Sequence, residues 1–287
     1  MKQQLLGLIA ETSIHAGAGK SVGVIDLPIQ REAATGWPCV YGSGMKGAMR
    51  SKAETQGADW VNDVFGPDTR NASEHAGALA VSDARLLLLP VRSLTSHFKW
   101  VSCPALIRRA LADARRAGVA HVPTLELPSI GAEQALHAGK ASTLYLEEYR
   151  FEAIEHDLSQ LMAFLARFVA DATFAAQLEQ QLVVVNDNLF THLAVHATPV
   201  TPHIAIDNTR KTVKDGALWC EESLPPETVL YVLLAASPSR NPKARLSAEH
   251  MLECALSLFP SSAPYLQIGG NETVGMGWCR VSPVGAA

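Results

Sequence analysis

A glycine-flanked segment over residues 42–50 carries side chains that could bind an anion. Its sequence, Gly-Ser-Gly-Met-Lys-Gly-Ala-Met-Arg, places Ser43 at the expected N-cap of a helix over 45–54. Lys46 and Arg50 are four residues apart, so they share one face of that helix beside its positive end. Free N–H groups at a helix start bind anions. The segment indicates either a contact with phosphate or a capped helix with two exposed bases.

Two glycine motifs resemble nucleotide-binding loops without their structural context. Gly42–Gly47 fits GxGxxG, but a dinucleotide fold wants an acid about 20 residues later at the end of a strand. Asp59 and Asp63 have that spacing and lie in no obvious strand. Gly17–Ser21 resembles the end of a P-loop, but Ile14 stands where the motif needs glycine. An ATPase is disfavoured, and a nucleotide-cofactor enzyme using Gly42–Gly47 remains a weak alternative.

Other catalytic and metal-binding patterns are poorly supported. His192 and His196 would share a helix face, but HLAVH lacks the glutamate of a zinc protease. Gly19–Gly23 matches GxSxG, but the β-like stretch that follows ends at Pro28 and gives no helix for a nucleophile elbow. No cysteine has an obvious histidine partner in the sequence, so a Ser or Cys hydrolase is disfavoured. The five cysteines are scattered and form no CxxC. We therefore expect reduced thiols and a cytoplasmic protein.

Composition predicts a globular protein, and the order of strand-like and helix-like segments predicts an α+β fold. The 287 residues are 48% hydrophobic and 18% charged, enough for two domains or for one core with long insertions. Apolar runs at 86–91 and 229–236 are too short for a membrane span, so we expect no membrane contact. Strands and helices interleave with long excursions, which favours one elaborated core. The expected strands are 5–10, 37–41, 78–82, 85–90, 183–185, 229–236 and 278–282, and the expected helices are 45–54, 157–181 and one capped by Ser247.

Charge is distributed unevenly, although the net charge is only −4. Residues 1–52 have a net charge of +3, residues 92–116 of +5 and residues 147–187 of −6. These segments form either three solvated faces or a basic track opposite an acidic face. Residues 195–218 are rich in Thr, Pro, Asp, Asn and Lys and lack core periodicity, which predicts a protruding loop or hairpin.

A succession of short blocks resembles the RAMP superfamily, in particular the repeated backbone subunit of the type III-B CRISPR (Cmr) effector complex. The string Asp-Leu-Pro-Ile-Gln-Arg at 26–31 follows His15 and precedes Pro38, and the pattern continues through the segment at 42–50. Ser223 departs from the family pattern, which has an aromatic residue there. The similar blocks are residues 15–50, 65–66, 79–104, 204–231 and 268–277.

The resemblance implies a single RAMP domain with a ferredoxin-like (RRM-like) palm, helical insertions and a protruding thumb hairpin. The palm would comprise 1–104, 182–197 and 228–287. Residues 105–181 would be a helical insertion, and residues 198–227 the thumb, with Ile206, Thr209 and Lys211 among its residues. Copies of the subunit would stack in a helical filament along a guide RNA.

The resemblance also implies how RNA would be held and cut. The guide would be bound along its phosphate backbone, without sequence preference, and complementary single-stranded target RNA would be cleaved at regular intervals. Other Cmr subunits would complete the complex, and we expect cleavage only in the assembled complex. The alternative is a non-cleaving RAMP scaffold that only binds guide RNA. The expected RNA-binding residues are Ser43, Lys46, Arg50, Gly269, Gly270, Gly275 and Gly277.

The implied reaction is metal-dependent attack by the ribose 2′-OH on the adjacent phosphate. Asp26 is the expected catalytic residue, with His15 and Glu221 as further candidates. A solvated aspartate is a weak base at neutral pH, so Asp26 is expected to bind Mg²⁺ or Mn²⁺ or to position the substrate. Histidine is the better proton carrier at that pH, which favours His15 for proton transfer.

Overall fold

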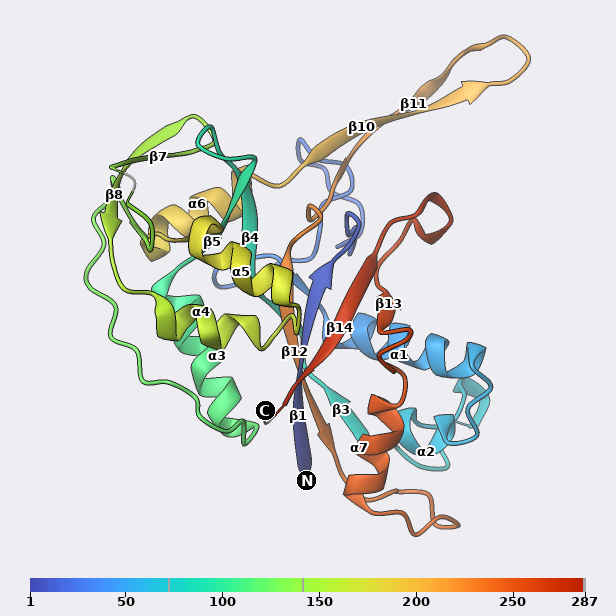
Figure 1. The fold of residues 1–287 in the computed structure, drawn as a ribbon. Coiled ribbons are helices and arrows are strands. Elements are labelled where there is room, and N and C mark those ends of the chain that lie inside the picture. Colours follow the sequence, from blue (N-terminus) through green and yellow to red (C-terminus); the bar gives the residue numbers. More distant parts are fainter. Residues whose placement is uncertain (72, 141, 286–287) are drawn as a thin grey trace.

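A large mixed sheet forms the centre of the computed structural model, which describes residues 1–71, 73–140 and 142–285 (Figure 1). The main path of this 12-stranded sheet runs β13-β14-β1-β12-β4-β5-β9-β6-β8-β7, with β2 paired to β4 and β3 paired to β12. Most neighbours are antiparallel, and only β5–β9 and β6–β8 are parallel in the described chain. The strands are β1 Lys2–Ala10, β2 Cys39–Val40, β3 Leu79–Val81, β4 Ala84–Arg92, β5 Phe98–Ser102, β6 Gln134–His137, β7 Thr143–Leu146, β8 Tyr149–Glu155, β9 Leu182–Val184, β12 Val229–Ala236, β13 Tyr265–Gln267 and β14 Trp278–Val284.

Helices cover both faces of this sheet, so its central strands are apolar on both sides (Figure 1). In β1, Leu6 and Leu8 pack into the core that α1, α2, α6 and α7 help to form. Leu5 and Ile9 alternate with them and pack into a second core, with α3, α4 and α5. The helices are α1 Gly42–Thr55, α2 Val61–Phe65, α3 Pro104–Arg116, α4 Ser159–Ala166, α5 Ala172–Gln181, α6 Asp187–His196 and α7 Ala248–Leu256, with 3₁₀ turns at Thr69–Asn71 and Glu272–Val274.

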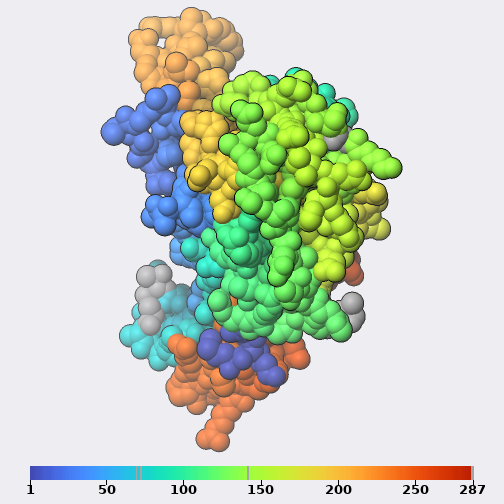
Figure 2. All heavy atoms as spheres, turned by 90° about the vertical axis from the view of Figure 1, so that its left-hand side faces the viewer, coloured from blue at the N-terminus to red at the C-terminus, as the bar shows by residue number. Residues whose placement is uncertain are grey.

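A two-stranded hairpin projects away from the body of the molecule (Figures 1 and 2). It consists of β10 Val200–Asp207 and β11 Thr212–Glu222, paired with each other in a separate sheet. The Asp207 carboxylate organises the turn at its tip by accepting hydrogen bonds from the N–H groups of Thr209 and Arg210, at 2.8 and 3.0 Å. The expected protruding segment is therefore a long antiparallel hairpin, and we call it the thumb.

Three local predictions need correction. The helix expected over 157–181 is two helices, α4 and α5, because Ala170 has a left-handed φ of 49° and Asp171 caps a new helix. Ser43 is not an N-cap, since α1 begins at Gly42 and its first N–H donates to Asp83 Oδ1 at 2.7 Å. Residues 105–181 are not purely helical, because β6, β7 and β8 extend the main sheet there.

The topology also removes the nucleotide-cofactor alternative. The strand before α1 is only Cys39–Val40, and it pairs antiparallel with β4. A dinucleotide fold needs parallel strands joined across its glycine loop. Gly42 has a different purpose here, because a Cβ on it would lie 2.5 Å from the carbonyl oxygen of Val81. The glycine permits a close approach of two backbones.

Within the described residues, no helix combines the length and apolar character needed to cross a bilayer.

Candidate RNA-cleavage site

The loop between β1 and β2 is tied to the root of the thumb. It has little regular structure, yet isolated backbone bridges join Ile14 to Leu224 and Leu27 to Glu221. A third bridge joins Gly17 to Ile29, which folds the loop back on itself. Figure 1 shows this blue segment beside the base of β10 and β11. The loop therefore carries residues 15 and 26 to the end of a strand that lies about two hundred residues later in the sequence.

Asp26 is exposed and anchored by one oxygen. Its Oδ2 accepts a 2.8 Å hydrogen bond from the backbone N–H of Cys220 in β11. Its backbone oxygen accepts from Ser21 N–H at 2.9 Å, which closes the tip of the loop. No hydrogen bond to Oδ1 is found within the described residues. The side chain is thus oriented by the protein and still presents an oxygen to solvent, as a metal ligand or a group that contacts RNA requires.

His15 is buried beside the same strand, with its ring held in one tautomer. Its Nδ1 lies 2.7 Å from the carbonyl oxygen of Glu222. A carbonyl only accepts, so Nδ1 carries the proton and Nε2 keeps the lone pair. The backbone of Gly17 passes close to that nitrogen, since a Cβ at Gly17 would lie 2.9 Å from Nε2. The neutral ring can therefore accept a proton only through Nε2.

Glu221 and Glu222 point in opposite directions because successive strand residues alternate. The Glu221 carboxylate is buried, lies 3.7 Å from His15 Nδ1 and accepts a hydrogen bond from the Asn271 side-chain amide. The Glu222 carboxylate instead receives hydrogen bonds from Arg31, Thr198 and the Ile29 backbone. The structure therefore brings the predicted His15, Asp26 and Glu221 to one place.

The glycine-rich loop supports His15 rather than offering free amides. The N–H groups of Gly270 and Gly277 donate to the carbonyls of His15 and Ser13 at 2.9 and 2.8 Å, and that of Gly275 donates to Glu272 at 2.9 Å. A Cβ at Gly269 would lie 2.3 Å from the His15 carbonyl oxygen. Three of the four predicted phosphate-binding amides already have acceptors, so their role is to let the loop pack on the His15 segment.

The start of α1 forms a separate positive patch. Burial lowers the pKa of Lys46, and the charges of Arg240 and Arg50 add to this effect. Part of the Arg50 charge is used internally, by Glu54 at 2.7 Å and by the carbonyl of Gly66 at 2.8 Å. Ser43 is exposed in the first turn, where helix N–H groups lack intrahelical acceptors. The patch can bind an anion, although Asp83 occupies the first N–H of the helix.

The thumb presents apolar and aromatic surface above the Asp26 loop. Ile206 is 53% exposed, and Thr209 and Lys211 lie in the exposed turn at the tip. Near the root, the rings of His203 and Trp219 stack with centroids 5.5 Å apart and planes within 15°. These two rings are half-exposed and therefore able to contact a nucleobase.

No ready-made metal cage was found. Among the described residues, no group of three or more His, Cys, Asp or Glu side chains is placed to hold an ion. Mg²⁺ commonly takes only one or two protein carboxylates, with water and substrate phosphates completing its shell. The free Asp26 oxygen fits that kind of site. His192 and His196 do share a face of α6, with ring centroids 4.5 Å apart, but they too have no third described ligand.

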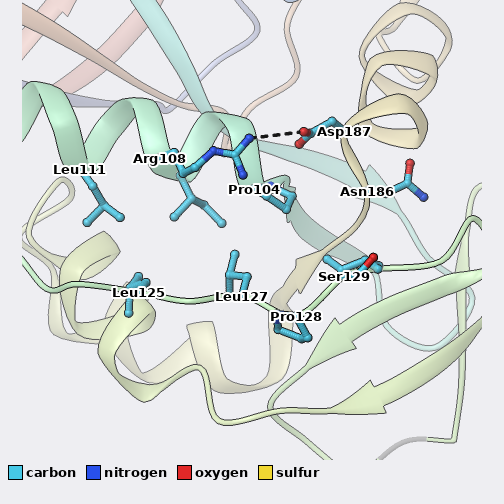
Figure 3. Close-up of a pocket in the computed structure, with 11 residues that line it drawn as sticks. Pro104, Arg108, Leu111, Leu125, Leu127, Pro128, Ser129, Asn186 and Asp187 are labelled. Atoms are coloured by element: carbon cyan, nitrogen blue, oxygen red, sulfur yellow. Dashed lines mark ion pairs between the residues drawn. The ribbon is translucent and has the colours of Figure 1, made fainter.

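Cavities are also found away from this cluster. One of about 470 Å³ lies between α3 and residues 125–130, with Arg108 and Asp187 paired at one end, 3.6 Å apart (Figure 3). None of its lining residues belongs to the cluster around Asp26. Asp26 lies beside the thumb at the surface, as an extended polymer substrate would require, whereas His15 and Glu221 are buried next to it.

Sequence reasoning missed Asn271, Glu222, Arg31 and Arg240. Asn271 could have been suspected, because asparagine tolerates the left-handed backbone it adopts, φ 62°, in a glycine-rich loop. Arg31 lies in the string at 26–31, in which only Asp26 is a predicted site residue. Nothing in the sequence links Arg240 to Lys46, since they are nearly two hundred residues apart.

Comparison with known proteins gives one consistent result. A family model for the RAMP superfamily matches residues 8–280. The chain is 33% identical over 292 residues to the "CRISPR system Cmr endoribonuclease Cmr4" of Pyrococcus furiosus, covering 98% of this chain and 96% of that protein. The crystal structure of oligomeric Cmr4 from Pyrococcus furiosus superposes with a TM-score of 0.75 at 27% identity, covering 99% of this chain and 98% of the other. A chain of the type III-B Cmr-beta complex bound to cognate target RNA shares the fold, with a TM-score of 0.73 at 20% identity and coverage of 99% and 98%.

Proposed function

The chain belongs to the RAMP superfamily and, within it, to the Cmr4 family, and on that premise we propose that it is an endoribonuclease and backbone subunit of an RNA-targeting CRISPR complex. The relationship to an endoribonuclease extends over almost the whole length of both proteins. The observation that carries the proposal is the position of Asp26, exposed at the root of the thumb and fixed there by Cys220. His15 and Glu221 lie in the same cluster.

Guide RNA is bound through its phosphate backbone. The patch of Lys46, Arg50 and Arg240 beside the start of α1 supplies the positive charge, and Ser43 supplies a helix-start N–H. Phosphate contacts fix the register of a strand and carry no sequence information. The subunit therefore accepts any guide, and base pairing between guide and target supplies the specificity.

Target RNA is cleaved beside each thumb by transesterification. The 2′-oxygen bonds to the adjacent phosphorus, the P–O5′ bond breaks, and the products carry a 2′,3′-cyclic phosphate and a 5′-OH. The 2′-OH proton passes to a base, and the leaving O5′ takes up a proton. His15 Nε2 is suited to accept the first proton, since Nδ1 is committed to the Glu222 carbonyl. Glu221 stabilises the ring once it is charged, from 3.7 Å away.

Asp26 positions the reacting phosphate, and it is the residue that would hold a divalent ion. Bound there with phosphate oxygens, Mg²⁺ or Mn²⁺ would neutralise charge that develops on the phosphoryl group. The single exposed carboxylate and the absence of a described three-ligand cage fit an ion that arrives with the substrate. Asp26 also ties its loop to the root of the thumb, because its other oxygen accepts a hydrogen bond from β11.

Assembly follows from the same proposal. Copies of the chain stack along one guide with other Cmr subunits, and the thumb of each copy interrupts the guide–target duplex at a regular interval. We assign a ferredoxin-like palm to residues 1–104, 182–197 and 228–287, which supply α1, α7 and the strands of the main sheet other than β6, β7 and β8. The hairpin within 198–227 is the thumb, and residues 105–181 are an insertion. Five unpaired cysteines support a reducing, cytoplasmic compartment.

The test is cleavage by the reconstituted complex. The chain is assembled with a guide and the other Cmr subunits, then incubated with complementary RNA and Mg²⁺ or Mn²⁺. A ladder of products at a constant spacing, with cyclic phosphate ends, is the expected result. Target binding without cleavage under either ion would instead identify a scaffold that only binds guide RNA. Electron-microscopic images of the RNA-bound protein should show a stacked filament.

A further inference from the structure

The Glu222 carboxylate is enclosed at the junction of the thumb and the Asp26 loop. The residue is only 2% exposed. Its Oε2 accepts a 3.0 Å hydrogen bond from Ile29 N–H, and its Oε1 accepts from Thr198 Oγ1 at 2.7 Å and from the Arg31 guanidinium. A buried carboxylate is costly unless it is fully paired. Glu222 is therefore stable only when β11, the Asp26 loop and the segment before β10 are all in contact with it.

Arg31 extends these contacts to a third element. Its Nη1 donates to the carbonyls of Gly36 and Ala194, each at 2.8 Å. The Ala194 carbonyl lies in the last turn of α6, where carbonyls have no intrahelical donor. Arg31 therefore caps the helix that leads into the thumb, while its other nitrogen binds Glu222.

The Glu222–Arg31 pair lies where both strands of the thumb leave the body of the protein. Thr198 lies just before β10 and Glu222 ends β11, and the N–H of Ser223 donates to the Pro199 carbonyl at 3.0 Å. The same strand end holds the catalytic loop, since Leu27 N–H donates to Cys220 at 3.1 Å and Glu222 N–H donates to Leu27 at 3.0 Å. Asp26 therefore directly precedes Leu27, whose backbone is hydrogen-bonded to Cys220 and Glu222 at the end of β11.

We propose that Glu222 and Arg31 form a positioning clamp, which holds the Asp26 loop against the thumb root in the geometry needed for cleavage. The clamp does not touch the reacting atoms. It acts through Ile29 and Leu27, whose amides keep Asp26 on Cys220. This role rests on the proposed function for its effect on cleavage, and on the contacts alone for its effect on the loop.

The first test uses Glu222→Gln in the assembled complex. The amide has nearly the same shape and leaves Arg31 without its anion. We expect single-turnover cleavage to slow by roughly ten- to hundredfold, because small misplacement of a reacting group costs that much. Target affinity should stay within about twofold, because the variant removes no RNA contact. Hydrogen exchange at the Leu27 and Ile29 amides should become faster.

Two variants sharpen the test. Thr198→Val removes one hydroxyl donor at constant volume, and a smaller change in the same direction is expected. Glu32→Gln is the matched control, since Glu32 neighbours Arg31 and forms its own half-buried pair with Arg109 at 2.7 Å without touching Glu222. The control should leave cleavage and exchange at residues 27–29 unchanged.

Each outcome decides the clamp. If Glu222→Gln cleaves at the wild-type rate, the clamp is overturned, even where hydrogen exchange at residues 27 and 29 becomes faster. A parallel loss of target affinity and melting temperature also overturns it, because that marks general destabilisation. Failure of the proposed function is separate, since it would appear as normal cleavage by Asp26→Asn. In that case, unchanged exchange in Glu222→Gln would still reject the clamp.

Discussion

The backbone N–H of Cys220 donates a 2.8 Å hydrogen bond to Oδ2 of Asp26. This bond joins the tip of an exposed loop to the last residues of β11, a strand of the projecting thumb. An acid in such a loop would otherwise sample many rotamers and contribute little to catalysis. Its attachment means that movement of the thumb root and movement of the carboxylate are coupled.

Replacement of Asp26 with asparagine should abolish cleavage without disassembling the complex. Asparagine keeps an oxygen that can accept from Cys220, but it removes the negative charge that we propose binds a metal and orients phosphate. We expect single-turnover cleavage to fall by at least about a hundredfold, with unchanged guide and target affinity. Asp59→Asn, at an exposed site outside the cluster, is the control. Cleavage at the normal rate by Asp26→Asn would remove it from the reaction.

Replacement of Asn271 with glycine should weaken the support of Glu221. Glycine accepts the left-handed backbone at this position, so the change deletes the amide without adding strain. Glu221 then loses its hydrogen-bond donor beside His15. We expect about a tenfold slower cleavage with little change in melting temperature. Asn271→Ala should match it in rate and be less stable, and equal stability of the two variants would contradict the backbone argument.

Guide binding should depend on pH through Lys46. Burial, then Arg240 and Arg50, lower the pKa of this lysine from its ordinary 10.5. Phosphate binds the protonated form, so its contribution is present below that lowered pKa and is lost as the pH rises through it. Anisotropy with a 2′-O-methyl RNA, which resists alkali, should show affinity falling earlier than expected for a free lysine. The RNA affinity of Lys46→Arg should change less at high pH. Lys46→Gln should reduce the slope of log affinity against log salt concentration by about 1.

Replacement of Tyr231 with phenylalanine should destabilise the fold and leave the site intact. The buried Tyr231 hydroxyl donates to Asp113 Oδ2 at 2.9 Å, beside the Arg85 guanidinium at 2.7 Å. Loss of a buried donor to a charged acceptor should lower the free energy of unfolding by about 1–3 kcal/mol, measured by urea denaturation. Tyr149→Phe, at an exposed position, is the control.

Wild-type stability should also fall at high pH for the same reason. Burial, with the nearby Asp113 charge, raises the pKa of Tyr231 above its ordinary 10.0. A raised pKa in the folded state means that the contribution is complete below pH 10.0 and is lost as the pH rises through the folded value. Tyr231→Phe should show a weaker alkaline decline, and an equal decline in both proteins would contradict this assignment.

Much of the framework could be predicted from local pattern. The apolar runs at 5–10 and 229–236 predict strands, and both strands are central in the sheet and buried. The polar segment at 195–218 predicts the thumb, because it could not form a core. Ser247 is an N-cap, as expected, with its hydroxyl accepting from His250 N–H at 3.1 Å. These features depend on residues close to one another in the chain.

Other elements depended on distant contacts. The break between α4 and α5 falls at Ala170, a residue with no turn preference, and Asp171 is held there by Arg280 of β14 at 2.9 Å. The short strands over 134–155 alternate weakly and are recognisable mainly by their pairing with the main sheet. Local propensity could not reveal either feature, since tertiary partners decide both.

The sequence by itself determined which residues are available for chemistry: His15 and Asp26 in one loop, two adjacent glutamates at 221 and 222, and a cationic helix start. Only the tertiary structure decided which side chains each glutamate contacts. The single bridge from Leu27 to Glu221 fixes the register, and strand alternation then turns one carboxylate to His15 and the next to Arg31. A shift of one residue would exchange them, and such a register is set by packing between segments almost two hundred residues apart.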